Sequence, residues 1–309
     1  MSLCHAPNLP AMRRLVPACL AALLLLAGCG SDDSGGSAAS GFDSDRAFDD
    51  LQAQVDFGPR PAGSPAAHRT AEWIAGRMRD ADLESARIQS PWQNVVGTIP
   101  GSAPGTVVVG AHYDTKNGIP RFVGANDGAS GVAVLLELAR TLPRPLPGPA
   151  VQLVAFDAEE ARDDRDFDVD GTRGSRQYVA DARRGGRDGA VPLKQIRAMV
   201  LFDMVGDCEL QIPREQNSDP ALYGLFADAA AERTGDAAPF TGRTFAVSDD
   251  HVPFLEAGVP AVDLIDFDYG PGPTPGAYWH TPDDTVDRTC AESLGAVGEA
   301  ALEAIPRIR

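Results

Sequence analysis

The sequence predicts a single α/β domain with a mixed, mostly parallel central sheet and helices on both of its faces. Apolar strand-like runs alternate with helical stretches along the chain, which is the pattern of a largely parallel sheet. From about residue 42 onward, no second low-complexity linker and no internal repeat divides the chain. Because sheets of this kind place ligands at the carboxyl ends of their strands, we expect the functional site at that edge.

Each expected element follows from a local pattern. The first helix is predicted by the apolar residues Ala71, Ile74 and Met78, which stand at helical spacing with charged residues between them. The first strand is an unbroken apolar run that ends in His112 and Asp114. In chain order, the expected elements are helix 66–83, strand 106–114, helix 132–142, strand 151–156, strand 198–203, helix 221–232, strand 259–264 and helix 290–305.

The composition excludes some classes of function. The 309 residues are 43% hydrophobic, which is too apolar for a disordered chain. Acidic residues outnumber basic ones by 44 to 27, and the formal net charge is −17. Because a surface this acidic repels phosphate groups, nucleic acid is not an expected partner.

The N-terminus resembles a bacterial lipoprotein signal. Arg13 and Arg14 precede the apolar run Leu15–Ala27, which is too short to span a bilayer comfortably. The pattern Leu-Ala-Gly-Cys ends at Cys29, so we expect lipidation of Cys29 and an anchor on the extracytoplasmic side of the bacterial cell envelope. An ordinary signal cleaved nearby is the alternative, and a start at Met12 would give a more typical leader. The expected organisation is a signal peptide over 1–28, a flexible tether over 29–41 and a catalytic domain over 42–309.

Two cysteines, Cys208 and Cys290, belong to the expected mature domain. In an oxidising compartment they could pair, or both could be buried free thiols. Their spacing does not decide between these two states.

A set of histidines and carboxylates indicates the chemistry. Glu159 and Glu160 directly follow an apolar strand, and adjacent carboxylates repel each other unless a cation lies between them or one holds a proton. Asp127 lies in a glycine-rich turn, Gly124–Ser130, that opens a helix. Histidines mixed with carboxylates suit a hard or borderline divalent metal, and a spare carboxylate would serve as general base. In chain order, the candidates are His112, Asp114, Asp127, Glu159, Glu160, Asp203 and His280.

The motifs HYD, GANDGASG, EE, FDMVG and WHTPDDT, in this order, resemble the zinc-dependent peptidase family 28 and its close relative, the glutaminyl cyclases. The resemblance extends from about residue 57 to the C-terminus and implies a zinc exopeptidase fold of the phosphorylase/hydrolase-like type. It also implies that Asp127, Glu160 and His280 bind the catalytic zinc. Glu159 would be the general acid/base in either family.

The same resemblance gives roles to the remaining candidates. In the aminopeptidases, His112 and Asp203 would bind a second zinc that Asp127 bridges. The cyclases keep both residues but use a single zinc. Asp114 would lie behind His112 and orient it.

Several features favour a cyclase. Lys116 completes the sequence His-Tyr-Asp-Thr-Lys, and Asp249 and Asp250 form the doubled acid that is typical of cyclases. Trp279 directly precedes His280 and would form a wall of the substrate pocket. Asp249 would hydrogen-bond the general base or the reaction intermediate.

Other features favour an aminopeptidase. The segment 161–173 lacks the tryptophan that animal cyclases carry after their glutamate pair, and Asp263 stands where those enzymes have a pocket histidine.

His251 is expected near the site as a structural hydrogen-bonding residue and not as a ligand.

The sequence therefore predicts an enzyme that acts on the N-termini of peptides or proteins. A cyclase would bind one zinc and convert N-terminal glutamine to pyroglutamate, with release of ammonia. An aminopeptidase would bind two zinc ions and hydrolyse N-terminal residues. A third reading is an inactive binding protein on the cell surface, which the complete candidate set disfavours.

Overall fold

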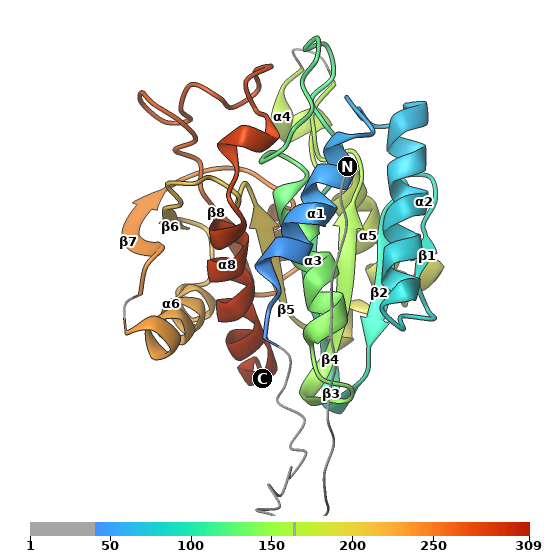
Figure 1. The fold of residues 1–309 in the computed structure, drawn as a ribbon. Helices are drawn as coiled ribbons and strands as arrows, with labels where there is room; N and C mark the ends of the chain where they lie inside the picture. Colours follow the sequence, from blue (N-terminus) through green and yellow to red (C-terminus); the bar gives the residue numbers. More distant parts are fainter. Residues whose placement is uncertain (1–40, 163–164, 236) are drawn as a thin grey trace, which may run out of the picture. The chain divides into compact units, whose positions relative to one another are not determined.

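The computed structural model describes residues 41–162, 165–235 and 237–309. Within them, a six-stranded sheet has the strand order β1-β2-β4-β3-β5-β8 (Figure 1). The strands β3, β4, β5 and β8 are parallel to one another, and β2 is antiparallel to both of its neighbours. A separate two-stranded parallel sheet consists of β6 and β7. The strand bounds are β1 Arg87–Ile88, β2 Val95–Ile99, β3 Gly101–His112, β4 Leu146–Phe156, β5 Ile196–Asp203, β6 Ile212–Glu215, β7 Phe240–Phe245 and β8 Ala261–Ile265.

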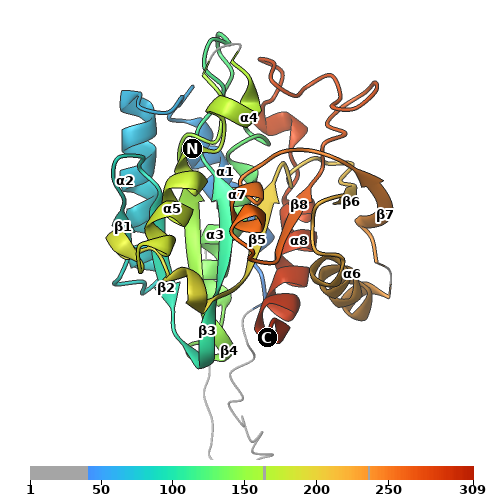
Figure 2. The same ribbon diagram turned by 180° about the vertical axis from the view of Figure 1, so that it is seen from behind.

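Helices cover both faces of the six-stranded sheet. The helices α1, α2, α3, α6 and α8 pack on one face, as Figure 1 shows, and α5 and α7 pack on the other, as Figure 2 shows. The fold class predicted from the sequence is confirmed. The helix bounds are α1 Ser44–Val55, α2 Pro65–Asp80, α3 Ser130–Thr141, α4 Phe167–Asp170, α5 Arg173–Arg183, α6 Pro220–Thr234, α7 Val252–Glu256 and α8 Ala291–Ala304.

The central strands are buried on both faces, which explains their unbroken apolar sequences. In β3, Val107 and Val109 belong to the larger hydrophobic core beneath α3, whereas Val108 between them belongs to the core beneath α5. This alternation follows from the two-residue period of a strand. A strand with both faces covered therefore has no position at which a polar side chain would be solvated.

Every element that the sequence predicts is present, with boundaries shifted by a few residues at most ends. Two of the central strands begin earlier than expected, at Gly101 and Leu146. The strands β1, β2, β6 and β7 and the helices α1, α4 and α5 were not expected. Asp43 begins α1 by accepting a hydrogen bond from the main-chain nitrogen of Arg46 at 3.0 Å.

Cys208 and Cys290 form a disulfide, which answers the question that their spacing left open. The bond joins residues 82 positions apart and links the loop after β5 to the residue that begins α8. The main-chain nitrogen of Cys290 also donates a 2.9 Å hydrogen bond to the carbonyl of Gly206. The disulfide therefore holds the loop after β5 against the start of the last helix.

The expected signal peptide, the lipidated Cys29 and all of the expected tether except its last residue lie outside the described residues. Among the described helices, none combines the length and the apolar character that crossing a membrane requires.

Candidate metal centre

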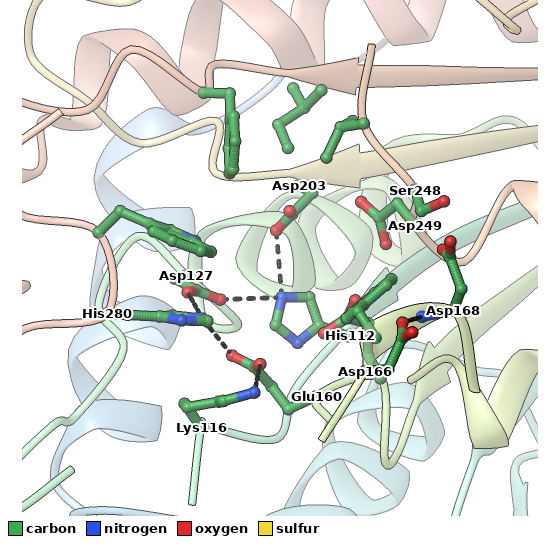
Figure 3. Close-up of a pocket in the computed structure, with 16 residues that line it drawn as sticks. His112, Lys116, Asp127, Glu160, Asp166, Asp168, Asp203, Ser248, Asp249 and His280 are labelled. Atoms are coloured by element: carbon green, nitrogen blue, oxygen red, sulfur yellow. Dashed lines mark hydrogen bonds and ion pairs between the residues drawn. The ribbon is translucent and has the colours of Figure 1, made fainter. Parts of the chain in front are cut away.

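The candidate residues gather at the carboxyl edge of the parallel strands. His112 is the last residue of β3 and Asp203 is the last residue of β5, while Glu159 and Glu160 follow the end of β4. Because these three strands are parallel neighbours, their carboxyl ends meet. The loops that carry Asp127 and His280 reach the same place, as Figure 3 shows.

The structure forms two overlapping groups of ligand-type atoms. In the first, His280 Nε2 lies 2.9 Å from Glu160 Oε1 and 3.3 Å from Asp127 Oδ2. In the second, His112 Nε2 lies 3.2 Å from Asp127 Oδ1 and 3.1 Å from Asp203 Oδ1. Within each group, the three candidate ligand atoms lie within 4.8 Å of one another. Asp127 belongs to both groups and presents one oxygen to each.

Burial and like charges disfavour the ionised forms of the two glutamates. Burial, together with the charge of Asp127, raises the pKa of Glu160. Burial also raises the pKa of Glu159 well above its usual range, and the charge of Glu160 adds to this effect although His112 opposes it. Burial acts in the same direction on Asp127, but His112 and His280 outweigh it and hold the pKa of Asp127 well below its usual range. Positive charge beside the glutamate pair would therefore favour its ionised form.

The neighbouring carboxylates raise the pKa values of the two histidines. Burial alone would lower the pKa of His280, but hydrogen bonds to Asp127 and Glu160 outweigh it and raise the pKa to about 10. His112 shows the same balance, because Asp203, Asp114 and Asp127 raise its pKa well above the usual value despite its burial.

The donor set fits a divalent cation. Each group combines one imidazole with two carboxylates, which is the mixture that a borderline metal such as Zn²⁺ binds. A cation between Asp127 and Glu160 would offset the repulsion that raises the pKa of Glu160. The residues present therefore suit a metal, and the group of Asp127, Glu160 and His280 reaches the cavity.

The turn that carries Asp127 is held by Asp284. This buried carboxylate accepts hydrogen bonds from the main-chain nitrogens of Asn126 at 2.8 Å and Asp127 at 3.1 Å. Its Oδ1 also accepts a 2.9 Å bond from the hydroxyl of Tyr269. Glycine is required at position 128, where φ is +100° and a Cβ would lie 2.7 Å from the carbonyl oxygen of Asp114.

Arg60 joins this turn to the end of β3. Its side chain is fully buried, with Nε donating to the carbonyl of Tyr113 at 2.7 Å and Nη2 to that of Gly124 at 2.8 Å. Nη1 donates to the carbonyl of Val123. Burial lowers the pKa of Arg60 to about 10, with Asp284, Asp114 and Asp127 opposing the shift. Arg60 therefore remains charged at neutral pH and lies beneath the acidic site.

Three non-glycine residues with positive φ lie at the same edge. Ala158, Met204 and His280 have positive φ values of 58°, 48° and 52°, which non-glycine residues rarely adopt. Ala158 precedes the glutamate pair, Met204 follows Asp203, and His280 is itself a candidate ligand. Strained residues of this kind persist only where the surrounding structure enforces them, and they cluster at functional sites.

Asp114 was expected to orient His112, but it also contacts the glutamate pair. Its Oδ1 lies 3.7 Å from His112 Nδ1. Its two oxygens also accept hydrogen bonds from the main-chain nitrogens of Glu159 at 3.0 Å and Glu160 at 3.3 Å. Asp114 therefore links the end of β3 to the glutamate pair that follows β4.

A cavity of about 390 Å³ opens beside the two groups. Glu159, Trp279, Ile265 and Phe267 are among its lining residues. The indole of Trp279 stacks on the ring of His280, with a centroid distance of 3.8 Å and an interplanar angle of 16°. The cavity thus has candidate ligands on one side and an aromatic wall next to them.

Asp249 lines this cavity but does not hydrogen-bond Glu159 in the structure. Its Oδ1 accepts from the main-chain nitrogen of Asp250 at 2.5 Å, and its buried Oδ2 has no hydrogen-bond partner among the described residues. Burial raises the pKa of Asp249 well above its usual range, and Asp263, Asp203 and Glu159 add to this effect. A hydrogen bond between Asp249 and Glu159 would require one of the two carboxyl groups to be protonated.

His251 and Asp263 lie behind the cavity. His251 is fully buried, and its Nε2 lies 3.2 Å from Glu215 Oε2, so it joins the loop after β7 to β6. Its Nδ1 lies 3.7 Å from Asp263 Oδ2. Asp263, which stands where animal cyclases carry a pocket histidine, faces His251 and is not among the residues that line the cavity.

Several residues around the site were missed by the sequence interpretation. Asp284 lies in the WHTPDDT motif and Arg60 lies near the start of the family resemblance, but their hydrogen bonds to the Asp127 turn depend on tertiary structure. Asp166, Phe167 and Asp168 line the cavity. The only signal for these three was their position just after the glutamate pair.

Comparisons with known proteins agree with this geometry. The family model of peptidase family M28 matches residues 94–305. Glutaminyl-peptide cyclotransferase of Bos taurus is 30% identical over 287 residues, covering 77% of this chain and 76% of that protein. The crystal structure of an Acidobacteriales bacterium glutaminyl cyclase is similar with a TM-score of 0.76 and 33% identity, covering 88% of this chain and 97% of that one. A Zn-dependent exopeptidase from Parabacteroides distasonis is similar with a TM-score of 0.74 and 25% identity, covering 87% and 99%.

Arg60 is expected to support metal affinity although it does not face the metal. Arg60→Met removes the donors to the carbonyls of Tyr113, Val123 and Gly124, so the Asp127 turn loses its support. We expect Zn²⁺ affinity to fall by about 10- to 100-fold, the range for lost residues that orient metal ligands. Competition with a chromophoric chelator measures the affinity, and circular dichroism verifies folding.

Arg77→Met is the matched control, because Arg77 pairs with Asp50 and does not line the cavity. Arg60→Lys, which keeps a buried cation, should lose less affinity than Arg60→Met. Unchanged Zn²⁺ affinity in a folded Arg60→Met variant would contradict the role given to Arg60.

Proposed function

This chain is a glutaminyl cyclase-like member of peptidase family M28, and we propose that it cyclises the N-terminal glutamine of peptides to pyroglutamate with release of ammonia. The observation that carries the proposal is the cavity in which a buried glutamate, Glu159, lies beside the group of Asp127, Glu160 and His280. The stacked Trp279 forms the wall next to this group. The similarity to cyclases from cattle and from a bacterium supports the same reaction.

We propose Asp127, Glu160 and His280 as the ligands of one Zn²⁺. The imidazole and carboxylate donors suit zinc, and a similar structure is a Zn-dependent exopeptidase. When bound, zinc would supply a Lewis acid for the γ-amide carbonyl of the substrate. Asp114 would hold the glutamate pair through its hydrogen bonds to the main-chain nitrogens of Glu159 and Glu160, and its Oδ1 lies 3.7 Å from His112 Nδ1.

Glu159 is the proposed general acid/base. The α-amine nitrogen of the substrate attacks the γ-amide carbon, so a C–N bond forms while the amine loses a proton to Glu159. Glu159 then gives this proton to the amide nitrogen, the original C–N bond breaks, and ammonia leaves. Burial raises the pKa of Glu159 well above its usual range, which makes its carboxylate a stronger proton acceptor than an exposed glutamate.

The cavity walls would position the substrate for this intramolecular attack. Trp279 and Ile265 would contact the methylene groups of the glutamine side chain and limit its rotation. The Oδ2 atom of Asp249, which has no hydrogen-bond partner among the described residues, would form a hydrogen bond with the substrate or the intermediate. Because the nucleophile and the carbonyl belong to one molecule, such positioning supplies much of the acceleration.

An aminopeptidase remains the second candidate, because His112 and Asp203 form a second group with Asp127. In this group His112 is hydrogen-bonded to Asp203 at 3.1 Å. The cyclase is favoured by Trp279 beside His280 and by the similarity to two cyclases. Metal stoichiometry separates the two, with one zinc for the cyclase and two for the aminopeptidase.

We also propose that the enzyme acts outside the cytoplasm, anchored to the cell envelope by lipid on Cys29. The apolar run before Cys29 supports this location, as does the disulfide between Cys208 and Cys290, since such bonds persist in oxidising compartments. Mass spectrometry of the mature protein should find its N-terminus at Cys29 with a diacylglyceryl group. An unmodified Cys29 inside a longer mature chain would refute the anchor.

The reaction is tested with two peptides that differ only at the first residue, glutamine or leucine. We expect the enzyme to release ammonia from the glutamine peptide and to leave the leucine peptide intact, because only glutamine carries a γ-amide. Coupled ammonia detection and mass spectrometry of the products measure both reactions. Release of free leucine would contradict the cyclase and favour the aminopeptidase.

The role of Glu159 is tested with Glu159→Gln, which keeps the shape of the side chain but not its proton transfer. We expect a loss of at least about 100-fold in kcat, the usual size of general acid/base catalysis, with zinc content unchanged. Full turnover by a zinc-loaded Glu159→Gln variant would rule out this assignment.

A further inference from the structure

The mouth of the active-site cavity is acidic. Most residues that line the cavity are buried or half-buried, and the exposed ones are Asp166, Asp168 and Ser248. Figure 3 shows Asp166 and Asp168 on the side of the pocket away from His280. Other lining residues, such as Ile265 and Asp249, are only 1% and 3% exposed. A peptide bound by its first residue would therefore leave past these two carboxylates.

The carboxylates of Asp166 and Asp168 have no cationic partner among the described side chains. The arginines of this segment converge instead on Asp170, which pairs with Arg162, Arg165 and Arg173. Arg176 donates to the main-chain carbonyl of Asp168 and to Thr172, not to a carboxylate at the mouth.

The one lysine that lines the cavity does not neutralise the mouth either. Lys116 Nζ donates to the carbonyl of Ala161 at 2.7 Å and lies 3.6 Å from Glu160 Oε2. Its charge is therefore directed at the candidate metal ligands. The mouth keeps two uncompensated negative charges in front of a cavity that accepts a peptide N-terminus.

A second, independent feature of the cavity also points to a ligand. Asp249 is buried and lines the same cavity, and its Oδ2 has no hydrogen-bond partner among the residues that the structure describes. A buried polar group without a partner is costly. This wall therefore suits a ligand that carries hydrogen-bonding groups.

We propose that the enzyme prefers peptides in which a basic residue follows the N-terminal glutamine, and that Asp166 and Asp168 select that residue. This proposal rests on the proposed cyclase function, which places glutamine in the deep part of the cavity. The second residue then lies at the mouth, where a lysine or arginine side chain pairs with the two carboxylates. An acidic second residue is repelled by the same charges.

The local structure allows the carboxylates to be removed without disturbing the segment. Asp166 begins α4 by accepting a 3.0 Å hydrogen bond from the main-chain nitrogen of Asp168. Asparagine is an equally good residue at this position. Asp166→Asn with Asp168→Asn therefore removes two charges and keeps the side-chain shapes.

The test compares three peptides, Gln-Lys, Gln-Ala and Gln-Glu followed by a common tail. We expect kcat/KM for Gln-Lys to exceed that for Gln-Glu by about tenfold or more at low ionic strength, since each exposed ion pair supplies up to about fivefold. In the Asp166→Asn, Asp168→Asn variant this ratio should fall to below about threefold. High salt should reduce the ratio of the unmodified enzyme, because exposed charges are screened.

Asp49→Asn with Asp80→Asn is the matched control. Both residues are exposed and neither lines the cavity, so this variant loses the same charge without changing the mouth. It should keep the full Gln-Lys to Gln-Glu ratio, which separates local selection from attraction by the net charge of −17.

The outcomes distinguish this proposal from the proposed function. Cyclisation of all three peptides at equal efficiency would overturn the preference and leave the cyclase function standing. A large ratio that persists in the Asp166→Asn, Asp168→Asn variant would overturn the assignment to these residues. If no glutamine peptide is cyclised, the cyclase function fails and the preference fails with it.

Discussion

The repulsion among buried carboxylates at the carboxyl edge of the sheet is the constraint on which this structure depends. Asp127, Glu159 and Glu160 are each less than a tenth exposed, and their mutual repulsion and burial would protonate some of them in the absence of positive charge. The protein places His280, His112 and the buried Arg60 around them. A divalent cation bound among these carboxylates would offset their repulsion, and the same cation would supply the chemistry that we propose.

The candidate metal ligands and the glutamate pair are held in place by hydrogen bonds to residues that do not line the cavity. Asp114 links the end of β3 to the glutamate pair, and Asp284 holds the turn that carries Asp127. At His280 and at the residues next to Glu159 and Asp203, the backbone adopts positive φ values that only surrounding contacts can maintain. The positions of the site residues are therefore fixed mainly by loops, and these loops are supported by a sheet that is buried on both faces.

The sequence predicted the parts of this structure that depend on local pattern. The apolar strands, the helix after the glycine-rich turn and the set of candidate ligands could all be recognised, because strand ends and turns carry the polar residues. The hydrogen bonds of Arg60 could not, since its acceptors belong to two separate stretches of chain. The pairing of Cys208 with Cys290 depended on a distance that spacing does not give. Asp166 and Asp168 looked like ordinary surface acids until the cavity placed them at its mouth.

Anomalous X-ray scattering at the zinc edge, from crystals of the zinc-loaded protein, tests the central claim most directly. The account predicts one fully occupied zinc position bonded to Asp127, Glu160 and His280, with His112 still hydrogen-bonded to Asp203 as it is here. A zinc position elsewhere would contradict the assignment of the metal centre. A second zinc of equal occupancy, held by His112 and Asp203, would contradict the single-metal cyclase.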